Sequence, residues 1–242
     1  MRIERLPTID STTLELQRRA QAGPLPADGL TLWADTQTGG IGRLGRRWFS
    51  PLGGLWLTSA IPASRPVSAC VSLAVAVLLA DLIDQVLVTS HRPERCRIKW
   101  PNDLMLADRK LGGILIHTVR QPTAAFLLVG IGVNLQNPSA SLPPDVAARA
   151  CSLADMACPA DLDRFGYALL AALPRAVARD DSAESVSAAR QRLWRPDRDV
   201  PITLPDGTEQ HGRMLDLCDD GALLVCFPEG TRPLHSVQEV QW

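Results

Sequence analysis

The sequence predicts an α+β fold in which a mixed sheet with helices is followed by a small all-β domain. Short apolar runs, typical of strands, alternate with helical segments over the first 194 residues. A helical pattern over 143–194 is then broken by Arg195-Pro196-Asp197. Beyond this break, 200–242 consists of short β-rich runs separated by turns. The predicted domains are therefore 1–194 and 195–242.

Capping and turn signals predict the individual elements. Thr12 followed by Glu15 forms a capping-box pattern, so Ser11 and Thr12 cap a helix or, alternatively, line a ligand pocket. The nearly continuous apolar segment 67–86 predicts a helix buried against the sheet. Strands are predicted, in order, over 31–35, 55–61, 96–99, 104–106, 111–119 and 125–133. The strands 104–106 and 111–119 read as a hairpin.

Composition excludes several classes of protein. A formal net charge of −1 argues against a broad nucleic-acid-binding surface. The longest apolar run, 67–80, is interrupted by serines and is too short to span a bilayer. The N-terminus lacks the apolar stretch of a signal peptide, which indicates a cytoplasmic protein. The six cysteines are predicted to be mostly buried free thiols, and the four dispersed histidines predict no zinc site.

The stretch 39–50, G-G-I-G-R-L-G-R-R-W-F-S, is typical of an anion-binding loop. Its glycines let backbone N–H groups approach a ligand, and its arginines match phosphate or carboxylate geometry. The glycines also match G-x-G-x-x-G, but no helix follows them and no acidic residue lies between Asp35 and Asp81. We therefore reject a dinucleotide-binding motif.

A second unusual stretch, 99–115, reads K-W-P-N-D-L-M-L-A-D-R-K-L-G-G-I-L. It places two lysines, a carboxylate at a proline-containing turn and a glycine pair within one predicted hairpin. Glycine inside a strand pattern usually marks the close approach of a ligand or of another backbone. Downstream, 130–134 reads G-I-G-V-N.

Together these three stretches resemble the biotin protein ligase family, whose hallmarks are G-R-G-R-x-G-R-x-W, K-W-P-N-D-L and G-x-G-x-N. The resemblance implies a class II synthetase-like biotin/lipoate ligase catalytic domain followed by a small SH3-like β-barrel. It also implies an activity in which ATP adenylates biotin, and biotin is then transferred to a lysine of a carrier protein. ATP and biotin would be substrates, with Mg²⁺ as the metal.

The resemblance implies a role for each matching residue. Lys110 would contact the biotin carboxylate and the α-phosphate, and Arg43 would retain the acyl-adenylate; these are the two expected catalytic residues. Asp103 would orient magnesium or phosphate. Further binding residues would be Ser11, Thr12, Thr13, Gln37, Gly40, Ile41 and Gly42 for biotin, Arg46, Trp48, Asn102 and Asn134 for the nucleotide, and Gly112 and Gly113 for close ligand approach.

The chain departs from the family pattern at two positions. Ile41 stands where arginine is usual, and Thr13 where asparagine is common. The missing loop arginine bears on how tightly the loop holds biotinyl-adenylate. Three neighbouring residues have other expected roles: Trp100 is predicted in the core, Arg47 in solvent, and Lys99 either at the surface or as a structural cation.

The expected partner is the biotin carboxyl carrier protein of acetyl-CoA carboxylase. Only ten residues precede Ser11, so we expect a monofunctional ligase without DNA binding, repressor activity or membrane contact, as a monomer or homodimer. The main alternative is a lipoate or octanoate protein ligase, which shares the fold and the two-step chemistry. A non-catalytic biotin or nucleotide sensor and an RNA-binding protein are the alternatives of a different class.

Overall fold

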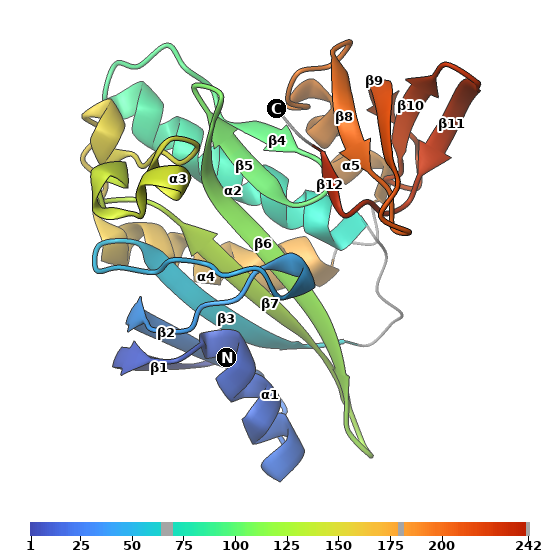
Figure 1. Ribbon diagram of the computed structural model, residues 1–242. Coiled ribbons are helices and arrows are strands. Elements are labelled where there is room, and N and C mark those ends of the chain that lie inside the picture. Colours follow the sequence, from blue (N-terminus) through green and yellow to red (C-terminus); the bar gives the residue numbers. More distant parts are fainter. Residues whose placement is uncertain (64–69, 179–181, 241–242) are drawn as a thin grey trace.

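The computed structural model describes residues 1–63, 70–178 and 182–240 (Figure 1). Its larger part is a seven-stranded sheet with the order β1-β2-β3-β7-β6-β5-β4. The strands are β1 (Arg2–Ile9), β2 (Leu30–Gln37), β3 (Leu55–Pro62), β4 (Arg97–Lys99), β5 (Asp103–Leu106), β6 (Arg109–Arg120) and β7 (Ala125–Val133). β1 pairs with β2 in parallel, and every other neighbouring pair in this sheet is antiparallel.

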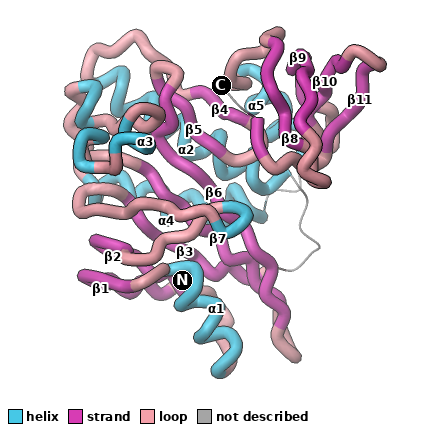
Figure 2. Tube along the Cα trace, in the orientation of Figure 1, coloured by secondary structure: helices cyan, strands magenta, loops and turns pink. Residues whose placement is uncertain are grey.

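Helices cover both faces of this sheet (Figures 1 and 2). On one face, α1 (Thr12–Ala22) packs through Leu16 on a small apolar cluster that includes Leu32 and Phe126. The main core lies on the other face, under α2 (Cys70–Thr89), α4 (Leu162–Ala178) and α5 (Ser182–Gln191). α2 contacts both α4 and α5 as well as strands of the sheet. A fully buried leucine in such a core stabilises the fold by roughly 1.5–3 kcal/mol.

The helix α2 is also the one described segment that is long and apolar enough to cross a membrane. Its 20 residues exceed the apolar run read from the sequence, so the argument that this region is too short to span a bilayer is wrong. Of the predicted helix 67–86, residues 67–69 lie outside the described residues. Val75, Leu79 and Ile83 are fully buried in the main core, as in the core helix of a globular protein.

The C-terminal part is a five-stranded antiparallel sheet, as the sequence predicted for a small β domain. Its order is β11-β10-β9-β8-β12. The strands are β8 (Asp199–Thr203), β9 (Glu209–Leu217), β10 (Leu223–Phe227), β11 (Gly230–Leu234) and β12 (Glu239–Val240). Its buried residues continue the main core, and the indole of Trp100 donates a hydrogen bond to the Gly221 carbonyl at 2.9 Å. The α+β prediction is confirmed; the domain division at 194/195 stays a prediction.

Several local predictions need correction. The strand β1 was missed because its charged, exposed residues hide the β pattern. The cap of α1 is Ser11, whose Oγ accepts from Leu14 N, and the Glu15 carboxylate instead binds Arg18 and Arg19. The helical segment 143–194 is interrupted by irregular backbone between α3 (Pro144–Ala147) and α4. By contrast, the prediction for the cysteines is confirmed, because all six are free and only Cys218 and Cys226 are partly buried.

Candidate active site

A cavity of about 270 Å³ opens between the 39–50 loop, the sheet and the C-terminal β domain. Most of the site residues expected from the motifs line it: Ser11, Thr12, Thr13, Gln37, Ile41, Gly42, Arg43, Arg46, Trp48, Asn102, Asp103, Lys110, Gly113 and Asn134. Gly40 and Gly112 are not among the lining residues. A β-carbon at Gly40 would lie 2.5 Å from the Trp48 carbonyl oxygen, and one at Gly112 would lie 2.8 Å from that of Gly132. Both glycines therefore permit close backbone packing behind the wall of the cavity.

The loop over the cavity is ordered by its own backbone. Trp48 N donates to the Gly40 carbonyl at 2.8 Å, and Gly42 N donates to the Arg46 carbonyl at 2.7 Å. At the tip, Leu44 adopts a left-handed φ of 56° and its side chain is exposed. These bonds fold the loop into a small hairpin that carries arginines on both of its sides.

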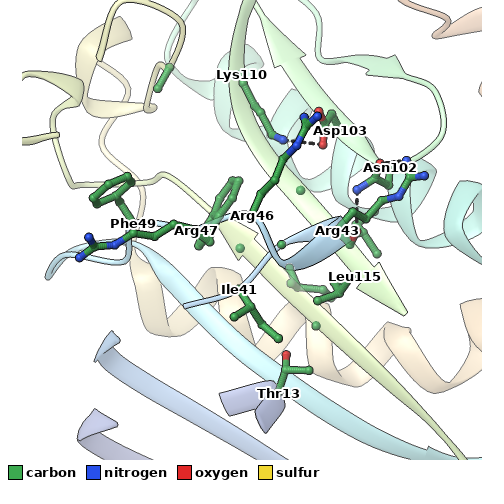
Figure 3. Close-up of a pocket in the computed structure, with 18 of the residues that line it drawn as sticks. Thr13, Ile41, Arg43, Arg46, Arg47, Phe49, Asn102, Asp103, Lys110 and Leu115 are labelled. Atoms are coloured by element: carbon green, nitrogen blue, oxygen red, sulfur yellow. Dashed lines mark hydrogen bonds and ion pairs between the residues drawn. The ribbon is translucent and has the colours of Figure 1, made fainter. Parts of the chain in front are cut away.

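The loop arginines contact the rest of the site through different partners. Arg43 donates to Asn102 Oδ1 at 3.2 Å and to the Val237 carbonyl at 2.8 Å, and burial lowers the pKa of its guanidinium. Arg46 forms an ion pair with Glu239 at 2.8 Å. Figure 3 shows Arg46 pointing toward Lys110 and Asp103, whereas Arg47 points away from them beside Phe49. Arg47 is exposed, as predicted.

A β-bulge directs Lys110 into the cavity. Met105 pairs with Lys110 while Leu104 pairs with Gly112, so Leu111 is an extra residue in β6. In a regular strand, Lys110 and Gly113 are three positions apart and would lie on opposite faces of the sheet. Instead, a β-carbon at Gly113 would lie 3.7 Å from Lys110 Cε, while Leu111 is fully buried in the main core. The Lys110 ammonium pairs with Asp103 Oδ1 at 2.6 Å.

The hairpin turn that precedes Lys110 is stabilised by contacts with residues outside the large sheet. Ala107 and Asp108 both have positive φ, at 47° and 59°. The Asp108 carboxylate accepts from Trp194 Nε1 at 2.9 Å and pairs with Arg195 at 3.0 Å, and these contacts lower its pKa. A non-glycine turn of this kind needs surrounding contacts to persist.

Trp48 forms one side of the cavity against a floor of glycines. A β-carbon at Gly132 would lie 2.6 Å from Trp48 Nε1, and one at Gly113 would lie 3.5 Å from the same ring. The Trp48 ring lies edge-on to Trp56, 6.3 Å away, and the Lys110 ammonium is 5.2 Å from its centre. Among the described residues, Trp48 Nε1 is one of three buried polar side-chain atoms without a hydrogen-bond partner. A flat face beside a cation suits a nucleotide base.

Hydroxyl and amide groups gather at the end of the cavity next to α1. Thr12 N and Oγ1 donate to Gln37 Oε1 at 2.8 and 3.1 Å, and Gln37 Nε2 donates to Ser50 Oγ at 2.8 Å. The Thr58 hydroxyl lies 2.8 Å from that of Thr12 and 2.9 Å from that of Thr13. Ser11 thus caps the helix and also lines the cavity, so both roles left open by the sequence coexist.

The remaining polar residues of the site are mostly engaged within the protein. Asn134 is 4% exposed, donates to the Cys151 carbonyl at 3.1 Å and accepts from Asn137. Lys99 is 5% exposed and belongs to the wall of the cavity, which excludes a surface role. Burial lowers the pKa of Lys99 to about 7, against the opposing attraction of Asp103. Trp100 is buried, as predicted.

Sequence reasoning missed part of the cavity. Thr58 and Gly130 face α1 from β3 and β7, and Glu239 comes from the far end of the chain. An alternating strand pattern could have placed Thr58 on the same face as the motif residues, whereas nothing local signals Glu239. Leu142, Val146 and Arg149 close the side next to α3. Among the described residues, no three His, Cys, Asp or Glu side chains cluster as a metal site.

Comparisons with known proteins assign the sequence to a family. Residues 6–134 match the model of the biotin/lipoate A/B protein ligase family, which is more than half of the chain. The chain belongs to this family. The family assignment predicted from the three motifs is therefore confirmed. Residues of all three motifs line the same cavity of this chain.

Curated members of the family show how far the similarity extends. A biotin–acetyl-CoA-carboxylase ligase of Mycobacterium tuberculosis is 33% identical over 227 residues, 92% of this chain and 81% of that protein. One from Paracoccus denitrificans is 30% identical over 95% of this chain and 96% of that protein. The bifunctional ligase/repressor BirA of Escherichia coli is 37% identical over 134 residues, and the match spans 39% of its length. The chain thus spans well under half of that relative.

Solved structures of family members share the fold. A biotin protein ligase from Aquifex aeolicus in complex with biotin and ATP superposes with a TM-score of 0.79 at 21% identity, over 97% of this chain and 96% of that one. A biotin protein ligase from Leishmania major in complex with biotin gives a TM-score of 0.66 at 21% identity, over 96% and 97%. Both matches include the C-terminal β domain as well as the large sheet.

Proposed function

We propose that this chain is an ATP-dependent biotin protein ligase. In the first step a biotin carboxylate oxygen attacks the α-phosphorus of ATP, the bond to the leaving oxygen breaks, and pyrophosphate departs. In the second step a lysine amine of a carrier protein attacks the acyl carbon, AMP leaves, and the amine proton passes to water. The proposed carrier is the biotin carboxyl carrier protein of acetyl-CoA carboxylase, as the names of the Mycobacterium tuberculosis and Paracoccus denitrificans relatives indicate.

The observation that carries this proposal is the charge arrangement around Lys110. Both reactants of the first step are anions, so the site has to offset their repulsion and the charge that develops at phosphorus. Lys110, Arg43 and Arg46 line one cavity, where Asp103 and Glu239 only partly balance them. Lys110 would bridge the carboxylate and the α-phosphate once it leaves Asp103, and Arg43 would hold the acyl-adenylate beneath the loop.

The two ends of the cavity suit the two substrates. The Ser11, Thr12 and Gln37 groups offer donors and acceptors to a cyclic urea, with Leu57 and Leu115 as apolar walls. At the other end, Trp48 would cover the adenine. Asn134 and Asn102 would act mainly through the backbone they hold, because their side-chain amides already bond to carbonyls.

A magnesium ion fits the site only together with the nucleotide. Asp103 is a single carboxylate, and Mg²⁺ commonly takes one or two carboxylates plus substrate phosphates and water. In this chain the Oδ1 atom of Asp103 is bound by Lys110. Asp103 would therefore hold the ion after Lys110 moves to the substrate, and the ion would neutralise phosphate charge.

The proposal also covers the setting of the enzyme: a cytoplasmic monomer or homodimer without DNA binding, repressor activity or membrane contact. The formal net charge of −1 supports the absence of a broad DNA-binding surface. A gel-shift titration with duplex DNA at low salt tests this part, and salt-sensitive binding would overturn it.

ATP–pyrophosphate exchange tests the activity directly. The purified chain is assayed with biotin, with lipoate and with neither acid. Biotin-dependent exchange is expected, because the polar end of the cavity matches a cyclic urea. Lipoate-dependent exchange would assign the chain to the other branch of the family, and biotin binding without exchange would indicate a sensor.

A further inference from the structure

The chain contains only two lysines, although lysine and arginine together number 25. The two are Lys99 and Lys110, and both line the cavity. Every other permanently positive side chain is an arginine, including those in the short segments outside the described residues. Outside the cavity, the surface that the structure describes therefore displays guanidinium groups and no lysine ammonium groups.

This distinction matters because of the product that the proposed function creates. An acyl-adenylate reacts with a neutral primary amine: the nitrogen bonds to the acyl carbon, the carbon–oxygen bond to the phosphate breaks, AMP leaves and the amine loses a proton to water. A guanidinium stays protonated at any relevant pH and its nitrogens are delocalised. Arginine therefore supplies the same charge as lysine without a nucleophile.

The arginines nearest the mouth of the cavity illustrate the point. Arg46 is 55% exposed and Arg47 is also exposed, and both belong to the loop that an escaping adenylate would pass. A lysine at either position would hold an amine within reach of the activated acyl group. With arginine at both, the loop keeps its charge for the anionic substrates.

The amines that the chain does possess are each engaged with a neighbouring group. Lys99 is 5% exposed, and its Nζ lies 5.7 Å from the centre of the Trp194 ring, within the wall of the cavity. The Lys110 amine pairs with Asp103 at 2.6 Å. The amino group of Met1 lies 3.2 Å from Asp28.

We propose that the chain is inert toward its own acyl-adenylate, because its exposed cations are arginines and its own amines are engaged with neighbouring groups. The acceptor amine must then come from another protein, and biotinyl-adenylate that leaves the site does not modify the enzyme. This inference rests on the proposed function, since it concerns the acyl-adenylate which that function forms.

The test compares the native chain with single arginine-to-lysine variants. Arg47→Lys places an amine at the mouth of the cavity, and Arg120→Lys places one at the exposed end of β6. Each protein is incubated with biotin and ATP together with a biotin carboxyl carrier protein as the acceptor, and intact mass spectrometry counts the biotins added. The native chain is expected to gain none while the carrier protein is labelled. Arg47→Lys is expected to gain one at residue 47, and Arg120→Lys to gain it more slowly.

A second arm removes any dependence on enzymatic activity. A biotin N-hydroxysuccinimide ester supplies an activated acyl group directly, so it reports amine reactivity even if the chain makes no adenylate. Both variants should react at the new lysine much faster than the native chain reacts anywhere. Biotin on Lys99 or Lys110 of the native chain in either arm, or an unreactive Arg47→Lys in the ester arm, would overturn the inference. Absence of labelling in the ATP arm alone, carrier protein included, would instead overturn the proposed function.

Discussion

The indole of Trp194 donates a hydrogen bond to the carboxylate of Asp108 at 2.9 Å, although the two residues are 86 positions apart. Trp194 lies in the segment that leads from α5 into the C-terminal β domain, and its backbone N donates to the Ile98 carbonyl at 2.8 Å. Asp108 belongs to the turn that precedes Lys110. The orientation of the Lys110 side chain is thus set partly by contacts with residues outside its own hairpin.

Replacement of Asp108 should therefore impair the chemical step more than substrate binding. In Asp108→Ala, kcat for biotin-dependent exchange should fall about tenfold, since small displacements of a reacting group are costly. KM for ATP and biotin should change little. Asp108→Asn, which retains an acceptor for Trp194, should keep most of the activity. Asp206→Ala, in another exposed turn, is the control, and an equal loss there would show that the effect is not specific to the Lys110 turn.

Loss of the Lys110 ammonium should remove adenylation. Lys110→Ala should lower the exchange rate by about a thousandfold, the scale expected for loss of a preorganised charge at the transition state. The fold should persist, because the side chain is partly exposed and its ion pair is with Asp103 in the cavity. Thermal unfolding followed by circular dichroism checks this. Exchange at the native rate in a folded variant would contradict the proposed role.

Arg43 should retain the intermediate rather than make it. Its guanidinium connects the loop to Asn102 and to the Val237 carbonyl, so Arg43→Gly removes both of these contacts. Biotinyl-adenylate should then escape and label lysines of bystander proteins. Streptavidin blots of a mixed lysate measure this, with Arg47→Gly as the control. Unchanged selectivity in Arg43→Gly would refute the retention role.

The glycine beneath Trp48 should be intolerant of a methyl group. In Gly132→Ala, the new β-carbon would lie 2.6 Å from Trp48 Nε1, so the indole has to move. KM for ATP should rise several-fold, and tryptophan emission should shift as the ring leaves its contact with Trp56. Gly23→Ala is the matched control, since a β-carbon there has open space around it. Native kinetics in Gly132→Ala would count against a wall formed by Trp48.

Lys99 should make stability depend on pH in the alkaline range. Its folded pKa is about 7, and the unfolded chain keeps its proton up to about 10.5. Between these values the unfolded state binds more protons, so the unfolding free energy should rise with pH, by at most about 1.4 kcal/mol per unit. Below pH 7 the contribution of Lys99 to the unfolding free energy does not change with pH. Urea titrations of the native chain and Lys99→Met at pH 7, 8 and 9 should show a stability gap that changes steadily, and a constant gap would rule out the shifted pKa.

Much of the site could be predicted because its residues come in contiguous motifs. The glycine–arginine loop, the segment from Lys99 to Gly113 and the G-I-G-V-N strand each carry local signals, and they meet because β3, β7, β6 and β5 are neighbours in one sheet. The sequence also predicted these strands and the C-terminal β domain. Their apolar runs are long enough to identify strands even where individual residues do not favour a strand.

The missed features depend on contacts between distant segments. The bulge at Leu111 depends on the register between β5 and β6, and the residue pattern of a single strand does not specify that register. Glu239 and Val237 reach the loop arginines only because the C-terminal sheet packs against the cavity. The strand β1 is stabilised by parallel pairing with β2 rather than by burial of its own side chains.

The glycine floor of the cavity has a practical consequence for the choice of ligand. At Gly113 a β-carbon would have ordinary van der Waals contacts, whereas at Gly130 it would crowd the Thr13 hydroxyl at 3.0 Å. Alanine at one of these glycines would therefore fill part of the binding site with a methyl group. The position of that methyl group in the cavity would depend on which glycine is replaced. The same backbone could then be adapted to shorter or trimmed acids, which would give enzyme–ligand pairs that do not cross-react with the natural one.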